Sequence, residues 1–275
     1  MKKYFILGSL FLGLIFIYTQ CNRKANATTT NNSTQRVAKL ETFQKNGITL
    51  TELYSPATFE NASLMQAVQS DAKEMDSNYI TLNYTAANYD FGTQTDRTGL
   101  KNCANSGQGQ HVHCIVDNQP YNAIYKNSGQ VYTFKDGQHI VLSFLSRSYH
   151  ESIKNKNAYV LSSVITGKSR YYTRYAAPDL TSPMMFYSRP KGTYKGDETE
   201  AVLLDFYLVN CDLSKDGYKV KAVINGTEFI LDKWCGYFME GLPKGKNTVQ
   251  LTLLDKKGNE VESPFNNVER TFTLE

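Results

Sequence analysis

Residues 80–91 have the sequence ITLNYTAANYDF, and residues 202–213 have the sequence VLLDFYLVNCDL. The two segments align at a spacing of 122 residues, and each ends in Asn-x-Asp followed by an apolar residue. In both, an apolar residue recurs at every second position, which is typical of a β-strand with one buried face. The alignment indicates that the second half of the chain repeats the strands of the first half.

Two further pairs of segments extend this repeat. Residues 111–118 align with residues 219–226, and residues 137–145 align with residues 245–253, both at a spacing of 108 residues. The shorter spacing indicates an insertion in the first copy within residues 92–110. That stretch is rich in Gly, Asn, Gln and Thr, and it predicts a long loop.

The repeat also contains a turn signal. Asn225 and Gly226 are typical of a two-residue hairpin, and Asp117 and Asn118 stand at the matching place in the first copy. We therefore expect a tight turn after the corresponding strand in each half.

Short strands separated by turns predict an all-β chain of two tandem antiparallel β-sandwich domains of the Ig-like type. The first domain is expected over residues 47–167 and the second over residues 182–275, with a connector at residues 168–181. The one helical candidate is 63–75, where apolar residues have roughly helical spacing.

One strand differs between the two copies. Ile140, Leu142 and Phe144 are apolar where the second copy has threonine or glutamine. Both faces of this strand are therefore predicted to be buried in the first domain, with the connector or the second domain as the cover.

The amino terminus predicts export. Two lysines precede an apolar run over residues 4–18, and Cys21 follows almost at once, so we expect a signal peptide at residues 1–20. Cys21 is the expected lipidation site, although Gln20 departs from the small residue usual before such a cysteine; ordinary secretory cleavage is the alternative. The polar residues 21–46 predict the anchor and a flexible tether. We expect a membrane-anchored lipoprotein of the bacterial cell envelope, at the outer membrane and facing the periplasm.

Composition excludes two classes of protein. The 275 residues carry a net charge of +4 with 20% charged and 41% hydrophobic residues, which argues against a wholly disordered chain and against a nucleic-acid partner. The remaining cysteines are Cys103, Cys114, Cys211 and Cys235; all three pairings are open, and Cys211 and Cys235 are expected to lie close enough for a disulfide.

The four histidines all lie in the first copy. His111 and His113 share one face of a strand, opposite the predicted core, where solvent exposure is expected. They form a possible Zn²⁺ or Cu²⁺ ligand pair, to which His150 could be added from a loop. His139 has the phase of the core residues and is expected to point away. The alternative is that these histidines are only exposed or hydrogen-bonded.

The connector and its flanks are basic and aromatic. Arginine and tyrosine together can bind anions, sugars and aromatic rings; the alternative is a solvated linker. The candidate ligand-binding residues are Arg170, Tyr172, Arg174, Arg189, Lys191 and Trp234.

Several motifs resemble those of a family of mostly uncharacterised Gram-negative lipoproteins, some of which carry a generic phosphopeptide-binding description. Tyr149 and Cys235 depart from the family pattern, and the resemblance implies a tandem sandwich without an established chemistry. The motifs are Gly109–His113 (GQHVH), Val116–Tyr121 (VDNQPY), Ser146–Ser152 (SRSYHES), Tyr187–Gly192 (YSRPKG) and Trp234-x-x-Tyr237.

Two functions follow as hypotheses. The leading one is a non-catalytic envelope lipoprotein that binds a protein, peptide or glycan near the domain junction. The alternative is a metal-binding protein or metalloenzyme that uses His111 and His113. The sequence has no hydrolase nucleophile motif, zinc-protease motif or phosphate-binding loop, which favours a protein that is not an enzyme.

Overall fold

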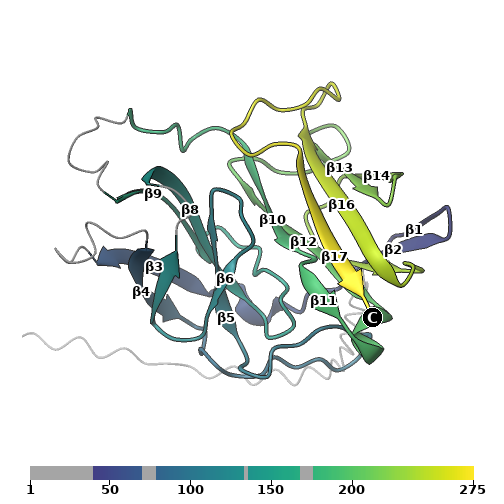
Figure 1. Cartoon of the computed structure of the whole chain (residues 1–275), viewed down its shortest axis with the longest axis horizontal. Helices are drawn as coiled ribbons and strands as arrows, with labels where there is room; N and C mark the ends of the chain where they lie inside the picture. Colours follow the sequence, from purple (N-terminus) through teal and green to yellow (C-terminus); the bar gives the residue numbers. More distant parts are fainter. Residues whose placement is uncertain (1–39, 70–78, 133–135, 168–175) are drawn as a thin grey trace, which may run out of the picture. The chain divides into compact units, whose positions relative to one another are not determined.

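The computed structural model describes residues 40–69, 79–132, 136–167 and 176–275, which belong to one compact unit and are built from strands (Figure 1). Two short 3-10 helices, η1 (Ala57–Phe59) and η2 (Gly196–Thr199), interrupt them. The strands are β1 (Thr42–Lys45), β2 (Ile48–Glu52), β3 (Ser63–Gln69), β4 (Tyr79–Ala87), β5 (His111–Val116), β6 (Asn122–Ile124), β7 (Ser128–Tyr132), β8 (Gly137–Ser146), β9 (Tyr159–Thr166), β10 (Met184–Arg189), β11 (Gly192–Tyr194), β12 (Val202–Val209), β13 (Lys219–Ile224), β14 (Thr227–Leu231), β15 (Tyr237–Glu240), β16 (Gly245–Leu254) and β17 (Val268–Leu274).

The strands form four sheets. The first half supplies a three-stranded sheet in the order β3-β4-β7 and a four-stranded sheet in the order β6-β5-β8-β9. The other two sheets have five strands each, in the orders β1-β2-β15-β12-β10 and β11-β17-β16-β13-β14. All pairings between these strands are antiparallel except β11 with β17, which is parallel and departs from the predicted all-antiparallel sheets.

The predicted inward faces are confirmed. In the first half, Leu82, Tyr84, Val112 and Cys114 belong to one buried cluster, which we call the first core. The matching positions of the second half belong to a separate cluster, the second core, which lies between the two five-stranded sheets; they are Val202, Leu204, Phe206, Leu208, Val220, Ala222 and Ile224.

The predicted turns are also present. Asn225 and Gly226 have positive φ angles of 46° and 81° between β13 and β14, and Asp117 and Asn118 have φ angles of 48° and 52° at the end of β5. Asn118 is buried, and its amide donates to the carbonyl of Met185 and accepts from the backbone N–H of Tyr187. This turn therefore attaches β5 to β10.

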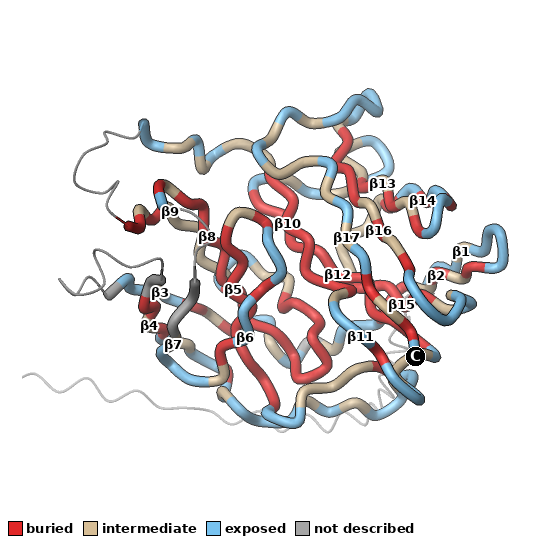
Figure 2. Tube along the Cα trace, in the orientation of Figure 1, coloured by how far each residue is buried: buried red, intermediate tan, exposed pale blue. Residues whose placement is uncertain are grey.

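A third cluster, the interface core, joins the two halves. It fills the space between the four-stranded sheet and the outer face of β10 and β12. Figure 2 shows β10 and β12 buried along their length. Phe144 and Tyr207 stack within it, with ring centroids 4.5 Å apart. The prediction that β8 is covered on both faces is confirmed, and the cover includes β10 and β12. The fully buried or nearly buried members are Ile115, Tyr121, Ile140, Leu142, Phe144, Met184, Phe186, Tyr207 and Val209.

The helix predicted over residues 63–75 is wrong where the structure describes it. Residues 63–69 form β3, which pairs with β4 over its whole length, and residues 70–75 lie outside the described residues. Leu64 is buried and Met65 is exposed, as expected for a strand with one covered face. A short apolar run fits both the helical and the strand period, and here pairing with β4 makes the segment a strand.

The amino-terminal strands belong to the second half by pairing. Residues 48–52 form β2, which pairs with β15, although the boundary predicted from the repeat placed them in the first domain. The repeat contains no copy of this segment, so the alignment could not assign it to a sheet.

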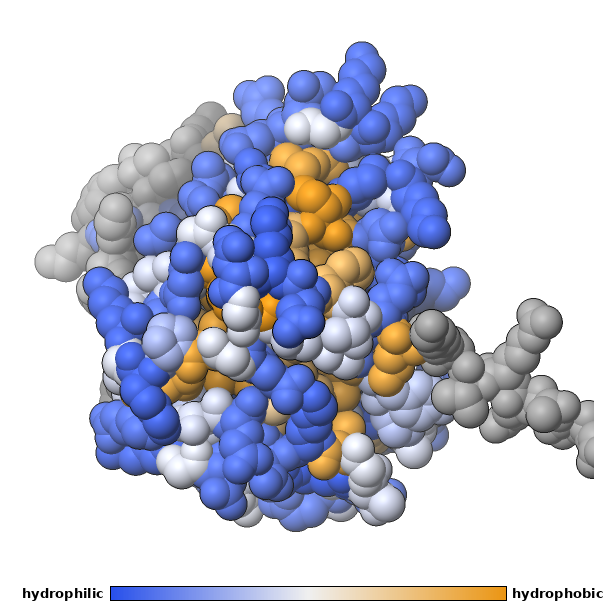
Figure 3. All heavy atoms as spheres, turned by 90° about the vertical axis from the view of Figure 1, so that its right-hand side faces the viewer, coloured by the Kyte–Doolittle hydropathy of each residue, from blue (hydrophilic) through white to orange (hydrophobic). Residues whose placement is uncertain are grey.

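The four described cysteines are free thiols, and the proximity expected of Cys211 and Cys235 stays a prediction. Within the described residues, no helix is long and apolar enough to cross a membrane. The face on the right-hand side of Figure 1 is mostly hydrophilic, with smaller hydrophobic areas between charged and polar residues (Figure 3).

Candidate metal centre

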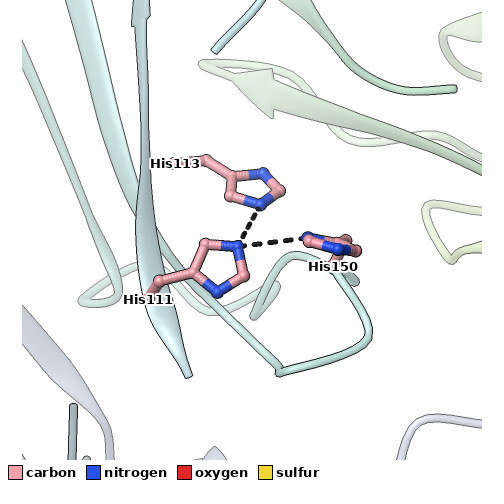
Figure 4. Close-up of side chains that lie close together, drawn as sticks. All are labelled: His111, His113 and His150. Atoms are coloured by element: carbon pink, nitrogen blue, oxygen red, sulfur yellow. Dashed lines mark hydrogen bonds between the residues drawn. The ribbon is translucent and has the colours of Figure 1, made fainter. Parts of the chain in front are cut away.

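Three histidines meet between the two halves. His111 Nε2 lies 3.0 Å from His113 Nε2 and 3.2 Å from His150 Nδ1 (Figure 4). All three ligand atoms lie within 4.8 Å of one another. Two nitrogens bound to a tetrahedral Zn²⁺ at 2.0–2.1 Å lie about 3.3 Å apart, so the separations from His111 Nε2 are close to those of a zinc site.

The face of β5 sets the position of the first two rings. His111 and His113 alternate with Val112 and Cys114, which point into the first core. The predicted solvent exposure of His111 and His113 is wrong, because both histidines are 0% exposed. Residues of the second half cover this face of β5, and the side chain of Ser188 reaches His113.

A turn after β8 brings in the third ring. The backbone N–H of Arg147 donates to the carbonyl of Glu151, and the N–H of His150 donates to the carbonyl of Arg147. His150 takes a left-handed conformation with φ of 71°, which costs conformational energy for a residue other than glycine. The turn folds the His150 ring back toward β5.

Buried contacts of Glu151 hold this turn. Tyr149 Oη donates to Glu151 Oε2 over 2.8 Å, and Ser55 donates to the other carboxylate oxygen. Arg147 Nε lies 3.1 Å from Glu151 Oε2 as an ion pair that lacks hydrogen-bond alignment. Glu151 is 0% exposed, so these partners offset the cost of burying its charge.

Hydrogen bonds fix the tautomer of His111. Its Nδ1 atom lies 2.8 Å from the carbonyl oxygen of Gly109, which can only accept, so Nδ1 carries the proton and Nε2 presents a lone pair. His113 Nδ1 lies 3.1 Å from Ser188 Oγ, and this hydroxyl can either accept or donate, so it is compatible with both tautomers of His113. Such partners orient imidazole ligands in metal centres.

All three rings are neutral near pH 7. Burial lowers the pKa of His111 to about 4, against a weaker opposing effect of the hydrogen bond to Gly109. Burial also lowers the pKa of His113 and of His150 far below the usual range, and the nearby Arg189 adds to the effect. Metal binding requires the neutral form, so the cluster is ready to bind without losing protons from these rings.

Aromatic and basic side chains complete the surroundings. The Tyr121 ring stacks on the His113 ring with centroids 3.5 Å apart, and its hydroxyl lies 3.3 Å from His150 Nδ1. Lys191 Nζ donates to the carbonyl of Tyr121 over 2.7 Å, and burial followed by the charge of Arg189 lowers the pKa of Lys191 to about 8. Two of the predicted ligand-binding residues, Arg189 and Lys191, are thus near the histidines.

The other predicted site residues lie elsewhere. His139 is not part of the cluster, as expected from its phase, and its Nδ1 atom lies 2.5 Å from Asp117 Oδ2. Trp234 donates to the carbonyl of Phe206 and packs edge-on against Tyr207, away from the histidines. Cys21, Arg170, Tyr172 and Arg174 lie outside the described residues.

Sequence reasoning missed Tyr121, Ser188 and Gly109 as members of this cluster. Each lies within a motif that carries the family resemblance, but the spacing of the motifs along the chain gives no indication that they meet. The signal that could have found them is the apolar second face of β8, which requires a covering layer close to β5.

No protein-family model matches this chain, and no curated protein matches it. Among solved structures, the chain is similar to fibronectin(III)-like modules of Clostridium thermocellum CbhA, with 10% sequence identity and a TM-score of 0.24. The match covers 76% of this chain and 93% of that one. This likeness is too weak to carry an argument about the site.

Proposed function

We propose that this protein is a metal-binding lipoprotein of the bacterial cell envelope, in which His111, His113 and His150 hold a transition-metal ion. The observation that carries the proposal is the convergence of three imidazole nitrogens, two of them 3.0 and 3.2 Å from the third, in a buried place between two sheets.

The chemistry of the donors favours Zn²⁺ or Cu²⁺. Imidazole nitrogen suits both ions, and the described surroundings offer neither a thiolate nor a carboxylate in the same group. The Gly109 carbonyl supports the tautomer of His111 that a metal requires, and the Ser188 hydroxyl can accept from His113 Nδ1 when His113 Nε2 binds a metal. The turn strain at His150 is consistent with a selected ring position.

The envelope location rests on the sequence. The charged start, the apolar run at residues 4–18 and Cys21 support a lipid anchor, and the polar residues after Cys21 support a tether. In this proposal the lipid holds the metal-binding unit at the outer membrane, on the periplasmic side, and the protein is not an enzyme.

Recognition of a protein, peptide or glycan near the junction is a second candidate function. The observation in its favour is a cavity of about 510 Å³ lined by residues of both halves, among them Tyr159, Asn210 and Trp234. Ligand sites typically combine aromatic side chains with a few polar groups that fix the orientation of the ligand. This cavity and the histidine cluster have no lining residue in common.

Metal titration tests the main proposal. Detergent-solubilised full-length protein, purified without a polyhistidine tag and treated with chelator, is titrated with Zn²⁺ and Cu²⁺ by calorimetry. We expect one ion per chain, and we expect the substitution of all three clustered histidines by Gln to abolish binding. His139→Gln is the matched control, because His139 lies outside the cluster, and it should bind as the wild type does. Equal binding by the triple variant and the wild type, or no binding by either, would reject the proposal.

A further inference from the structure

The cavity of about 510 Å³ between the two halves has an aromatic side chain from each half. Tyr159 lines it from the start of β9, and Trp234 lines it from the loop between β14 and β15. Both rings pack on Tyr207, with centroids 5.4 and 5.0 Å from the centroid of that ring. Tyr207 is buried, so it holds the two rings in place while each of them stays partly exposed.

Trp234 offers the cavity a rigid carbon surface. Its N–H donates to the carbonyl oxygen of Phe206 over 3.0 Å, so the ring is fixed in one orientation and its one donor is already used. The faces of aromatic rings carry partial negative charge and attract the polarised C–H groups on the flat side of a sugar ring. This part of the cavity therefore favours a ligand that has C–H faces.

Polar side chains stand beside these rings. The amide of Asn210 donates to the carbonyls of Leu180 and Ser182 over 2.8 and 3.0 Å, which fixes the side chain and leaves its carbonyl oxygen to accept from a ligand. Lys156 and Asp212 are exposed, and within the described residues neither forms an ion pair. Asn210, Lys156 and Asp212 all line the cavity and offer both donors and acceptors, which suits hydroxyl groups.

The charges around the cavity balance. Lys154 also lines it, but its Nζ atom lies 2.6 Å from Oδ1 of the buried Asp205, which neutralises it. The two remaining charges, those of Lys156 and Asp212, have opposite signs. A net charge near zero gives no preference for an anion or a cation, so the cavity suits an uncharged ligand.

The position and size of the cavity favour a small ligand over an extended peptide. Tyr159 is the first residue of β9, Leu208 precedes the last residue of β12, and the other lining residues lie in loops. Peptides that bind to β-proteins commonly pair along the edge of a sheet, whereas this cavity lies at the ends of strands. Its volume falls within the range of about 300–1,000 Å³ that is usual for sites of small molecules.

We propose that this cavity binds an uncharged saccharide. A pyranose ring packs against the two aromatic side chains, Trp234 and Tyr159. Its hydroxyl groups bond to Asn210, Lys156 and Asp212. The inference rests on the second candidate function, from which it selects the glycan, and it is independent of the metal site.

The fluorescence of Trp234 tests this proposal directly. Trp234 is the only tryptophan of the chain, so a change of its emission reports binding at this cavity. Detergent-solubilised full-length protein, free of metal, is titrated with glucose, N-acetylglucosamine and the β1,4-linked dimer of each, with excitation selective for tryptophan. We expect a saturable change of emission with at least one of these four sugars.

Two variants locate the bound sugar. Asp212→Ala should weaken binding by about tenfold, because hydrogen bonds to a charged acceptor are lost, and Asp212 is exposed, so the fold is retained. Tyr159→Ala should weaken binding by about fivefold through loss of the ring, with Tm measured because Tyr159 also packs on Tyr207. Asp197→Ala is the matched control, because Asp197 is exposed in η2 and does not line the cavity, and it should bind as the wild type does.

Glucuronic acid and trialanine are the comparison ligands. A saturable response to trialanine and to none of the four sugars would overturn the saccharide and leave peptide recognition at the cavity. Tighter binding of glucuronic acid than of glucose would contradict an uncharged ligand, and equal affinity of Asp212→Ala and the wild type would contradict the proposed contacts. No response to any of these compounds up to its solubility would overturn ligand recognition at this cavity altogether, while the metal titration decides the main proposal separately.

Discussion

Truncation of Phe144 tests whether the two halves form one packed unit. Phe144 is on the face of β8 that points away from the first core, and it is 0% exposed. Its ring stacks on Tyr207 with centroids 4.5 Å apart and contacts His113 at 5.2 Å. In two independent tandem domains this face would be open to water, and truncation would cost little.

The expected cost of Phe144→Ala is large. Replacing a fully buried Phe by Ala typically lowers the free energy of unfolding by about 3–5 kcal/mol, since it removes apolar contacts and leaves a cavity. Loss of the aromatic pair with Tyr207 contributes to this cost. For a chain of this size, each kcal/mol of lost stability lowers Tm by about 2–4 °C, so we expect Tm to fall by roughly 10 °C.

The assay is thermal and urea unfolding followed by circular dichroism on metal-free protein. Ile230→Ala is the control, because Ile230 lies on the edge strand β14 and is 42% exposed, and we expect it to cost under about 1 kcal/mol. If Phe144→Ala costs no more than Ile230→Ala, the face of β8 is not covered and the reasoning is refuted.

Three further changes have defined outcomes. Gly109→Ala should lower Tm and weaken Zn²⁺ binding, because Gly109 has φ of 81°, an added Cβ would overlap the Gly92 carbonyl, and the Gly109 carbonyl orients His111. Gly226→Ala is the control, because Gly226 has the same φ and open space around it. It should lower the free energy of unfolding by only about 1 kcal/mol and leave metal binding unchanged. Glu151→Gln should lower the free energy of unfolding in urea by about 3–5 kcal/mol, since it leaves Arg147 buried without a countercharge. Glu262 is exposed, so Glu262→Gln is the control, and an equal loss of stability in both variants would count against the pairing of Glu151 with Arg147. Cys21→Ser should prevent partitioning of the protein into the detergent phase, and unchanged partitioning would argue against a lipid on Cys21.

Local patterns predicted the strand faces because they repeat. Leu82 and Val112 in one half, and Leu204 and Val220 in the other, were assigned to cores by period-two alternation, and all four are buried. The turn at Asn225 followed from residue chemistry in the same way. Such features depend on a few neighbouring residues, so one sequence is enough to indicate them.

Non-local contacts decided what the sequence did not indicate. His111 and His113 were assigned correctly to the second face of a strand, but whether that face is exposed depends on β10, more than seventy residues away. The position of His150 depends on a turn held by Glu151 and Ser55, and β3 depends on pairing with β4. In each case the deciding partner has no fixed spacing from the residue that it positions.

The most direct test of the account is a crystal structure of the Zn²⁺-loaded protein with anomalous data collected on both sides of the zinc absorption edge. The account predicts one anomalous peak per chain, about 2.0–2.1 Å from the Nε2 atoms of His111 and His113 and from His150 Nδ1. A fully loaded crystal with no peak among these residues, or with its peak at other side chains, would contradict the account.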